Sequence, residues 1–190
     1  MTRAVLALGS NQGDRIGHLG QAVAQLGERV LLTSGVYETP PWGDTAQPAY
    51  LNGVVLVADA QAGPRGWLES AKACETAAGR VRDPARRYGP RTLDVDVIEV
   101  YEDDGTPVTS DDPELTLPHP RAHLRAFVLK PWLDIQPYAR LTGHGWVTDL
   151  LNRPELAADV AAMTPRPDLA GLFSNSPRDA PPHDRMGKQA

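Results

Sequence analysis

The sequence predicts an α+β fold of the ferredoxin-like kind, with a β-α-β-β-α-β core in which helices pack on an antiparallel sheet. Length is the first reason, because 190 residues and 20.5 kDa suffice for one domain. Composition is the second, since 41% hydrophobic residues can form a core and 23% charged residues keep the chain soluble. The third is the order of the apolar patterns, which alternate between strand-like and helix-like spacing.

Each core element follows from a local pattern. Short runs rich in apolar and β-branched residues predict strands at residues 4–8, 30–39, 50–59 and 92–101. Asp14 caps a helix that Gly27 ends, and Pro64 opens a second helix that Gly79 ends. We expect the two helices on one face of the sheet.

The pattern is less regular after the core. A short strand is expected at residues 115–117, and helical segments are expected at 120–129 and 146–151. From Pro165 the chain is rich in proline and lacks periodicity, so we expect a domain over residues 1–164 and a flexible tail over 165–190. Leu169, Leu172 and Phe173 could dock on the domain or on a partner.

Charge and cysteine content narrow the class of protein. A net charge of −5 and a pI near 5.5 argue against a protein that coats nucleic acid. Cys74 is alone, which excludes an internal disulfide and a cysteine-based zinc site. Neither a signal peptide nor a membrane-spanning stretch is recognisable. We therefore expect a cytoplasmic protein with small-molecule partners and neither nucleic acid nor membrane as a partner.

The most polar segment, residues 79–97, is the first candidate site. Asp94 and Asp96 are two apart on a predicted strand, so both carboxylates leave the same face. Mg²⁺ binds a few carboxylates together with substrate phosphates, and five arginines just upstream would complement a polyphosphate. An exposed edge strand with a polar face is the alternative for the Asp-x-Asp pattern alone. No P-loop is present, so a nucleotide would be held by side chains and metal.

Residues 87–98, Arg-Tyr-Gly-Pro-Arg-Thr-Leu-Asp-Val-Asp-Val-Ile, resemble the signature of the 6-hydroxymethyl-7,8-dihydropterin pyrophosphokinase family. Further segments of about residues 3–135 are similar to that family in the same order: residues 6–11, 37–43, 50–52, 117–120 and 125–129. The resemblance implies an enzyme, a Mg²⁺-dependent pyrophosphokinase of folate biosynthesis that moves pyrophosphate from ATP to a pterin alcohol.

The resemblance also implies roles for individual residues. Asp94 and Asp96 correspond to carboxylates that hold two Mg²⁺ ions. The catalytic group is Arg80, Arg82, Arg91, Asp94 and Asp96. The ATP-binding group is Lys72, Glu75, Arg82, Arg91, Val97, His119 and Arg125, where Lys72 stands at a position that is often Gln in the family. The pterin-binding group is Thr39, Pro40, Trp42, Tyr50, Asn52 and Phe127, with Tyr50 and Phe127 as the aromatic pair that sandwiches the ring.

Each assignment has a plainer alternative. Tyr50 and Phe127 could be core aromatics, His119 a solvated turn residue, and Glu75 an ordinary partner of Lys72 one helical turn away. Two other classes of protein stay open: an RNA-binding module with the same element order, and a pterin- or nucleotide-binding protein without catalysis. We expect the enzyme, acting as a monomer.

Overall fold

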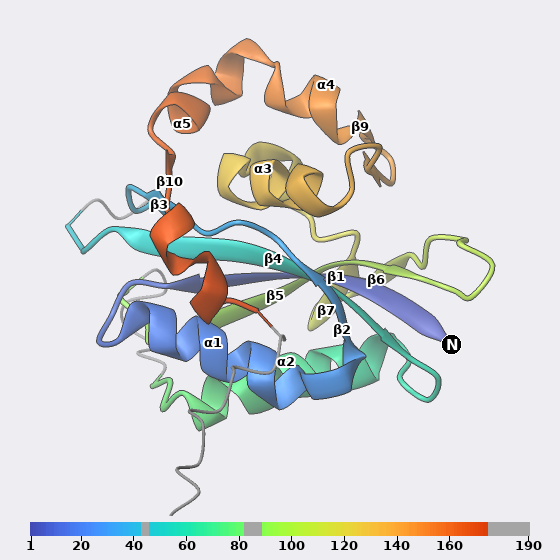
Figure 1. Ribbon diagram of the computed structural model, residues 1–190. Coiled ribbons are helices and arrows are strands. Elements are labelled where there is room, and N and C mark those ends of the chain that lie inside the picture. Colours follow the sequence, from blue (N-terminus) through green and yellow to red (C-terminus); the bar gives the residue numbers. More distant parts are fainter. Residues whose placement is uncertain (43–45, 82–88, 175–190) are drawn as a thin grey trace, which may run out of the picture.

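The computed structural model describes residues 1–42, 46–81 and 89–174, which build a sheet with helices on both faces (Figure 1). The strands are β1 (Thr2–Ser10), β2 (Val30–Thr33), β3 (Tyr37–Thr39), β4 (Tyr50–Asp59), β5 (Asp94–Tyr101), β6 (Ser110–Asp112), β7 (Leu115–Leu117), β8 (Arg140–Leu141), β9 (Gly145–Trp146) and β10 (Thr164–Pro165). The helices are α1 (Arg15–Leu26), α2 (Pro64–Ala77), α3 (Ala126–Ile135), α4 (Val147–Leu151) and α5 (Ala157–Ala161). Within these ranges no helix is long and apolar enough to cross a membrane.

The main sheet confirms the predicted ferredoxin-like order. Its strands run β10-β3-β4-β1-β5, with β2 also paired to β4, and every pair is antiparallel. The central strand β1 therefore lies between β4 and β5, and the C-terminal end of β1 lies beside the N-terminal ends of both. Residues from three segments distant in sequence meet at that end of the sheet.

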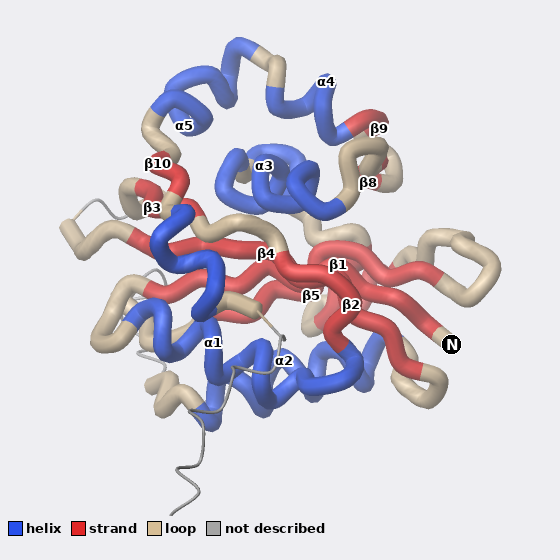
Figure 2. Tube along the Cα trace, viewed as in Figure 1, coloured by secondary structure: helices blue, strands red, loops and turns tan. Residues whose placement is uncertain are grey.

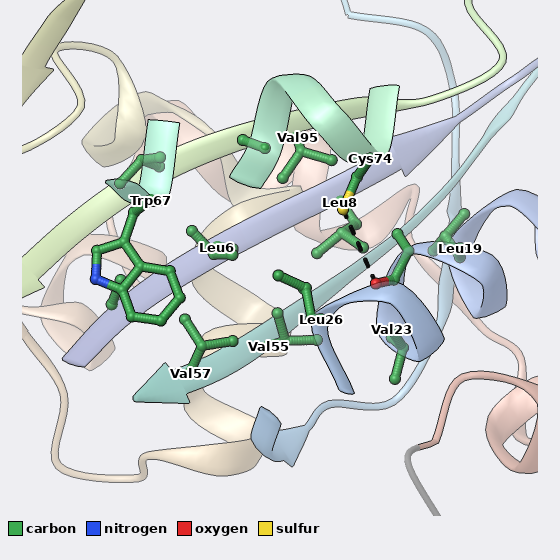
Figure 3. Close-up of a cluster of buried hydrophobic side chains, with 14 of the residues drawn as sticks. Leu6, Leu8, Leu19, Val23, Leu26, Val55, Val57, Trp67, Cys74 and Val95 are labelled. Carbon is green, nitrogen blue, oxygen red and sulfur yellow. Dashed lines mark hydrogen bonds between the residues drawn. The ribbon is translucent and has the colours of Figure 1, made fainter. Parts of the chain in front are cut away.

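The first core lies between the sheet and the helices α1 and α2 (Figures 2 and 3). The Asp14 side chain accepts a hydrogen bond from the Gly17 amide at the start of α1, and Pro64 occupies the first turn of α2. Alternate residues of β1 point into this core from Ala4 onward. Trp67 of α2 is fully buried there, so the two predicted helices share one face as expected.

A second core, on the opposite face, was not predicted. Helix α3 covers this face, and α4 and α5 pack outside it (Figure 1). We expected a short helix at residues 120–129, but α3 begins at Ala126 because Arg125 has an extended backbone, and it continues to Ile135. Trp132 is fully buried against the sheet.

The expected strand over residues 30–39 is two strands. The chain leaves β2 at Thr33 and resumes pairing in β3 at Tyr37. Between them, the Ser34 amide donates to the Val54 carbonyl at 2.9 Å and the Ser34 hydroxyl accepts from the Val54 amide at 2.8 Å. The Ser34 hydroxyl thus takes the place of a backbone carbonyl as the acceptor for Val54, and both β2 and β3 stay paired with β4.

The segment after Pro165 differs from the flexible tail that we expected, as far as the structure describes it. Thr164 and Pro165 pair with β3, and a 3₁₀ turn follows at Pro167–Leu172. Phe173 is fully buried in the first core, where its ring lies against Gly53. Residues 165–174 therefore dock on the domain, whereas 175–190 lie outside the described residues.

Candidate active site

A cavity of about 580 Å³ opens where β1, β4 and β5 meet α2 and the segment around residues 119–127. Every site residue expected from the sequence lines it except Arg82, which lies outside the described residues. The lining residues expected from the sequence are Thr39, Pro40, Trp42, Tyr50, Asn52, Lys72, Glu75, Arg80, Arg91, Asp94, Asp96, Val97, His119, Arg125 and Phe127. The cavity thus brings together residues that lie as far apart in the sequence as Thr39 and Phe127.

Asp94 is the centre of a charged cluster in the cavity lining, which we call the charged end of the cavity. Its carboxylate accepts hydrogen bonds from Arg80 at 2.5 Å and from Arg91 at 2.7 Å. Arg80 also donates to Glu75, a buried residue of α2 whose same oxygen accepts from the Val95 amide at 3.0 Å. Glu75 therefore pairs with Arg80 and not with Lys72, and it fixes the start of β5 to α2.

Asp96 has its own cationic partner. Arg125 donates to it at 2.6 Å, and the His119 Nε2 lies 3.8 Å from the same oxygen. The His119 amide donates to the Ile98 carbonyl, and its Nδ1 accepts from the Arg121 amide at 3.2 Å. His119 is consequently held facing the carboxylate and is not a free turn residue.

Burial and neighbouring charge shift the titration of these groups. Burial raises the pKa of Asp94, but Arg91 and Arg80 together outweigh it and hold that pKa below its usual range. Burial lowers the pKa of His119, against the opposing effect of Asp96. At neutral pH the structure therefore presents a carboxylate at Asp94 and a neutral imidazole at His119, which can accept one hydrogen bond and donate another.

We call the part of the cavity lining formed by Thr39, Tyr50, Asn52 and Phe127 its aromatic end. It adjoins the charged cluster, because burial raises the pKa of Tyr50 and the charges of Arg91 and Asp94 both act on that pKa. Tyr50 and Phe127 are half-buried and line the cavity, and Phe127 also packs against the second core. The side-chain amide of Asn52 donates to the Thr39 hydroxyl at 2.8 Å, and Asn52 is buried. This hydrogen bond fixes the orientation of the Asn52 side chain. The Arg125 guanidinium lies 5.6 Å from the Phe127 ring centre and 5.7 Å from that of Trp42.

Several lining residues were missed by the sequence reasoning. Glu114 and Thr116 come from the short β6–β7 hairpin, and Arg121 precedes α3. Lys72 lies 3.8 Å from Glu114, so it faces this hairpin and not Glu75. The alternation of residues 115–117 could have indicated a strand face, but nothing in the sequence placed that face beside α2.

The donor set fits Mg²⁺ held jointly with phosphates. The described residues contain no cluster of three or more acidic, histidine or cysteine side chains that could hold a metal ion alone. Asp94 and Asp96 are two carboxylates on one strand face that line the cavity, and their side chains are 27% and 31% exposed. Mg²⁺ commonly uses one or two carboxylates and completes its shell with waters and substrate phosphates.

Fold and site together define a class of protein: an α+β protein with a cleft that is suited to a polyphosphate at its charged end and to a flat heterocycle at its aromatic end. The model of the family described as 7,8-dihydro-6-hydroxymethylpterin-pyrophosphokinase (HPPK) matches residues 5–137. The chain belongs to this family.

Curated relatives carry the same family name. A protein of Mycobacterium tuberculosis named 2-amino-4-hydroxy-6-hydroxymethyldihydropteridine pyrophosphokinase is 48% identical over 164 residues, covering 83% of this chain and 86% of that protein. A protein of the same name from Methylorubrum extorquens is 48% identical over 141 residues, covering 72% and 84% of the two chains.

Solved structures share the fold. An HPPK-DHPS of Plasmodium falciparum matches with a TM-score of 0.61 at 13% identity, covering 87% of this chain and 47% of that one. An HPPK-DHPS structure in complex with substrates matches with a TM-score of 0.57 at 12% identity, covering 80% and 43%. This chain spans less than half of the length of those two-part proteins, and the likeness concerns the fold alone.

Proposed function

We propose that this protein transfers pyrophosphate from ATP to 6-hydroxymethyl-7,8-dihydropterin, giving AMP and the pterin pyrophosphate, in folate biosynthesis. The observation that carries the proposal is the joining, in one cavity, of the Asp94–Asp96 cluster and the Tyr50–Asn52–Phe127 end. The family match and the names of the relatives support the same reaction.

In this reaction the hydroxymethyl oxygen of the pterin attacks the β-phosphorus of ATP, and the bond from that phosphorus to the oxygen bridging to the α-phosphorus breaks. AMP leaves with that oxygen, and the hydroxyl proton passes to solvent or to a phosphate oxygen. Tyr50 and Phe127 hold the ring between them, while Asn52 reads its donor and acceptor edge.

The arginines supply positive charge to the phosphates. Arg91, Arg125 and Arg80 now neutralise carboxylates, and on nucleotide binding their remaining N–H groups donate to phosphate oxygens. Arg82, outside the described residues, joins them in our proposal. His119, Lys72, Glu75 and the backbone at Val97 complete the ATP side, and Thr39, Pro40 and Trp42 complete the pterin side.

Asp94 and Asp96 would hold two Mg²⁺ ions in this proposal. Bound there, Mg²⁺ neutralises charge on the triphosphate and polarises the phosphorus for attack. We assign no side chain the role of general base, and in this proposal positioning and charge neutralisation contribute most of the rate. The protein acts as a cytoplasmic monomer in this proposal, without nucleic-acid partners.

Product analysis tests the proposal directly. The purified protein is mixed with Mg-ATP and 6-hydroxymethyl-7,8-dihydropterin, and nucleotides and pterins are separated. AMP appearing in step with a pterin pyrophosphate is the expected result. ADP would mean transfer of a single phosphoryl group, and binding without turnover would favour a pterin-binding protein that lacks catalysis.

A further inference from the structure

Asn11 lies directly after β1 and is only 1% exposed, yet it does not line the cavity. A buried polar side chain in that place needs hydrogen-bond partners, and the partners of Asn11 belong to two different loops. One loop, at residues 89–93, precedes β5. The other, at residues 46–49, precedes β4.

The first pair of hydrogen bonds joins Asn11 to Arg91. The Asn11 backbone amide donates to the Arg91 carbonyl at 3.2 Å. The side-chain oxygen Oδ1 of Asn11 accepts from the Arg91 backbone amide at 2.8 Å. This reciprocal pair fixes the Arg91 backbone. From there the Arg91 guanidinium reaches Asp94 at 2.7 Å, so the link leads to the charged end of the cavity.

The second pair joins Asn11 to the loop before Tyr50. The Asn11 Nδ2 donates to the Gln47 Oε1 at 2.9 Å and to the Pro48 carbonyl at 3.2 Å. The same Gln47 oxygen accepts from the Tyr50 hydroxyl at 3.3 Å. This link therefore leads to the aromatic end of the cavity.

Asparagine suits this place because of its chemistry. Its short side chain offers one acceptor oxygen and two donor hydrogens, and all of these kinds of contact are used here. Aspartate would keep the acceptor but lose the donors, and alanine would lose both. Loss of the side-chain partner of the Arg91 amide and of the Pro48 carbonyl would favour displacement of both loops.

We propose that Asn11 is a positioning residue that sets the distance between the two substrates by tying the Arg91 loop to the Gln47 loop. The inference rests on the proposed function, in which Arg91 faces ATP and Tyr50 faces the pterin. A displacement of about 1 Å between reacting groups can cost about a hundredfold in rate, so the effect belongs in kcat more than in either KM.

Three variants separate the two links. Asn11→Ala removes the side-chain bonds of both, Asn11→Asp keeps the acceptor for Arg91, and Gln47→Ala removes one partner on the Tyr50 side. We expect kcat to fall by about thirtyfold to a hundredfold in Asn11→Ala, with each KM within about threefold, and by less in the other two. Asn152→Ala, at an exposed asparagine beside α4, is the matched control and should keep the wild-type kcat.

A binding measurement gives a readout independent of turnover. The Kd of the pterin is measured by calorimetry with and without Mg²⁺ and α,β-methylene-ATP, in which the bond to be broken is blocked. We expect the analogue to change the pterin Kd by at least about fivefold in the wild type and by a factor near one in Asn11→Ala. If Asn11→Ala does not fold, Asn11→Asp and Gln47→Ala carry the comparison.

The outcomes are distinct. Three results would overturn the positioning role. The ATP analogue could change the pterin Kd equally in wild type and variants, or it could leave the pterin Kd of the wild type unchanged. The third result is a rise in one KM alone with kcat unchanged. Absence of AMP from the wild type defeats the proposed function instead, and the binding comparison still decides whether Asn11 links the two ends.

Discussion

At the scale of single residues, the candidate site is a set of carboxylates already neutralised by arginines. Asp94 lies between Arg80 and Arg91, and Asp96 is paired with Arg125. Pairing of this kind offsets the cost of placing like charges two positions apart on one strand. It also keeps the arginines beside the place where phosphates would enter.

Asp96→Ala should abolish turnover while leaving the fold intact, because the carboxylate lies at the cavity and not in a core. We expect a loss in kcat of at least about a hundredfold, the scale found when one electrostatic group at a reacting centre is removed. The measurement is AMP formation together with a thermal melt. Asp111→Ala, at an exposed carboxylate of β6, is the control, and near-normal activity in Asp96→Ala would defeat the metal assignment.

Gly9 allows the Asn52 amide to approach the central strand closely. A Cβ added at Gly9 would lie 3.0 Å from the Asn52 Oδ1 and 3.7 Å from Tyr50 Cδ1. Because Thr39 fixes the other side of the amide, Gly9→Ala should raise the pterin KM by about tenfold, or about 1.4 kcal/mol, and leave the ATP KM within about twofold. Steady-state kinetics with each substrate varied separately would measure this.

Gly66→Ala is the matched control for that substitution. It adds the same methyl group in α2 at an ordinary 3.5 Å contact, and should leave both KM values unchanged. Equal KM values in Gly9→Ala and the wild type would show that Asn52 does not contact the pterin.

At the scale of elements, the C-terminal segment is connected to the strand that carries Thr39. Arg166 donates to Glu38 of β3 at 2.6 Å and also to Asp168. Arg15 lies 3.6 Å from the same Glu38 and donates to the Ala49 carbonyl. These contacts fix the edge of the sheet beside the aromatic end of the cavity. The segment is therefore part of the support of the site.

Phe173→Ala should destabilise the protein by about 3–5 kcal/mol, because it removes a fully buried ring and leaves a cavity beside Gly53. Urea unfolding followed by tryptophan fluorescence would measure the change. Leu172→Ala is the neighbouring control: Leu172 is 41% exposed, so its truncation should cost less than about 1 kcal/mol. Equal stabilities of wild type and Phe173→Ala would contradict the observed docking.

The sequence predicted the elements whose pattern is local. Asp14, Gly27 and Pro64 mark helix ends through their own backbone preferences, and the parity of Asp94 and Asp96 follows from strand geometry. The sequence left open whether Phe173 docks on the domain or on a partner, and it did not indicate the break at Ser34, because both depend on contacts distant in sequence. Asn11 stood in the family-like segment at residues 6–11, but its partners become visible only in the folded structure, where the loops lie side by side.

At the scale of the whole molecule, the two cores are joined across the sheet by β5. Glu99 on this strand is fully buried, and it accepts hydrogen bonds from the Thr142 amide at 3.0 Å and the Tyr101 hydroxyl at 2.9 Å. Thr142 lies in the turn between β8 and β9, beside the second core. Glu99 thus connects the sheet to the layer that includes α3 and α4.

Stability should fall as pH rises through the range where Glu99 ionises. Burial raises the pKa of Glu99 in the folded state despite the two hydrogen bonds. A raised folded pKa contributes stability that is fully present below the unfolded pKa of about 4.3 and is lost as pH passes through the folded value. The unfolding free energy of wild type minus that of Glu99→Gln should therefore decrease between pH 4 and pH 7. A difference that rises with pH would contradict this assignment.

The seating of Phe173 has a consequence for how the protein is made. Its ring lies on Gly53, and the Leu172 carbonyl approaches Gly20, so residues translated after α5 complete a core that begins with β1 and α1. In a nascent chain that has emerged only as far as α5, the place of the Phe173 ring in the first core is unfilled. Contacts over such sequence separation slow folding and prolong exposure of apolar surface, so this core is completed only after the segment that follows α5 has been made.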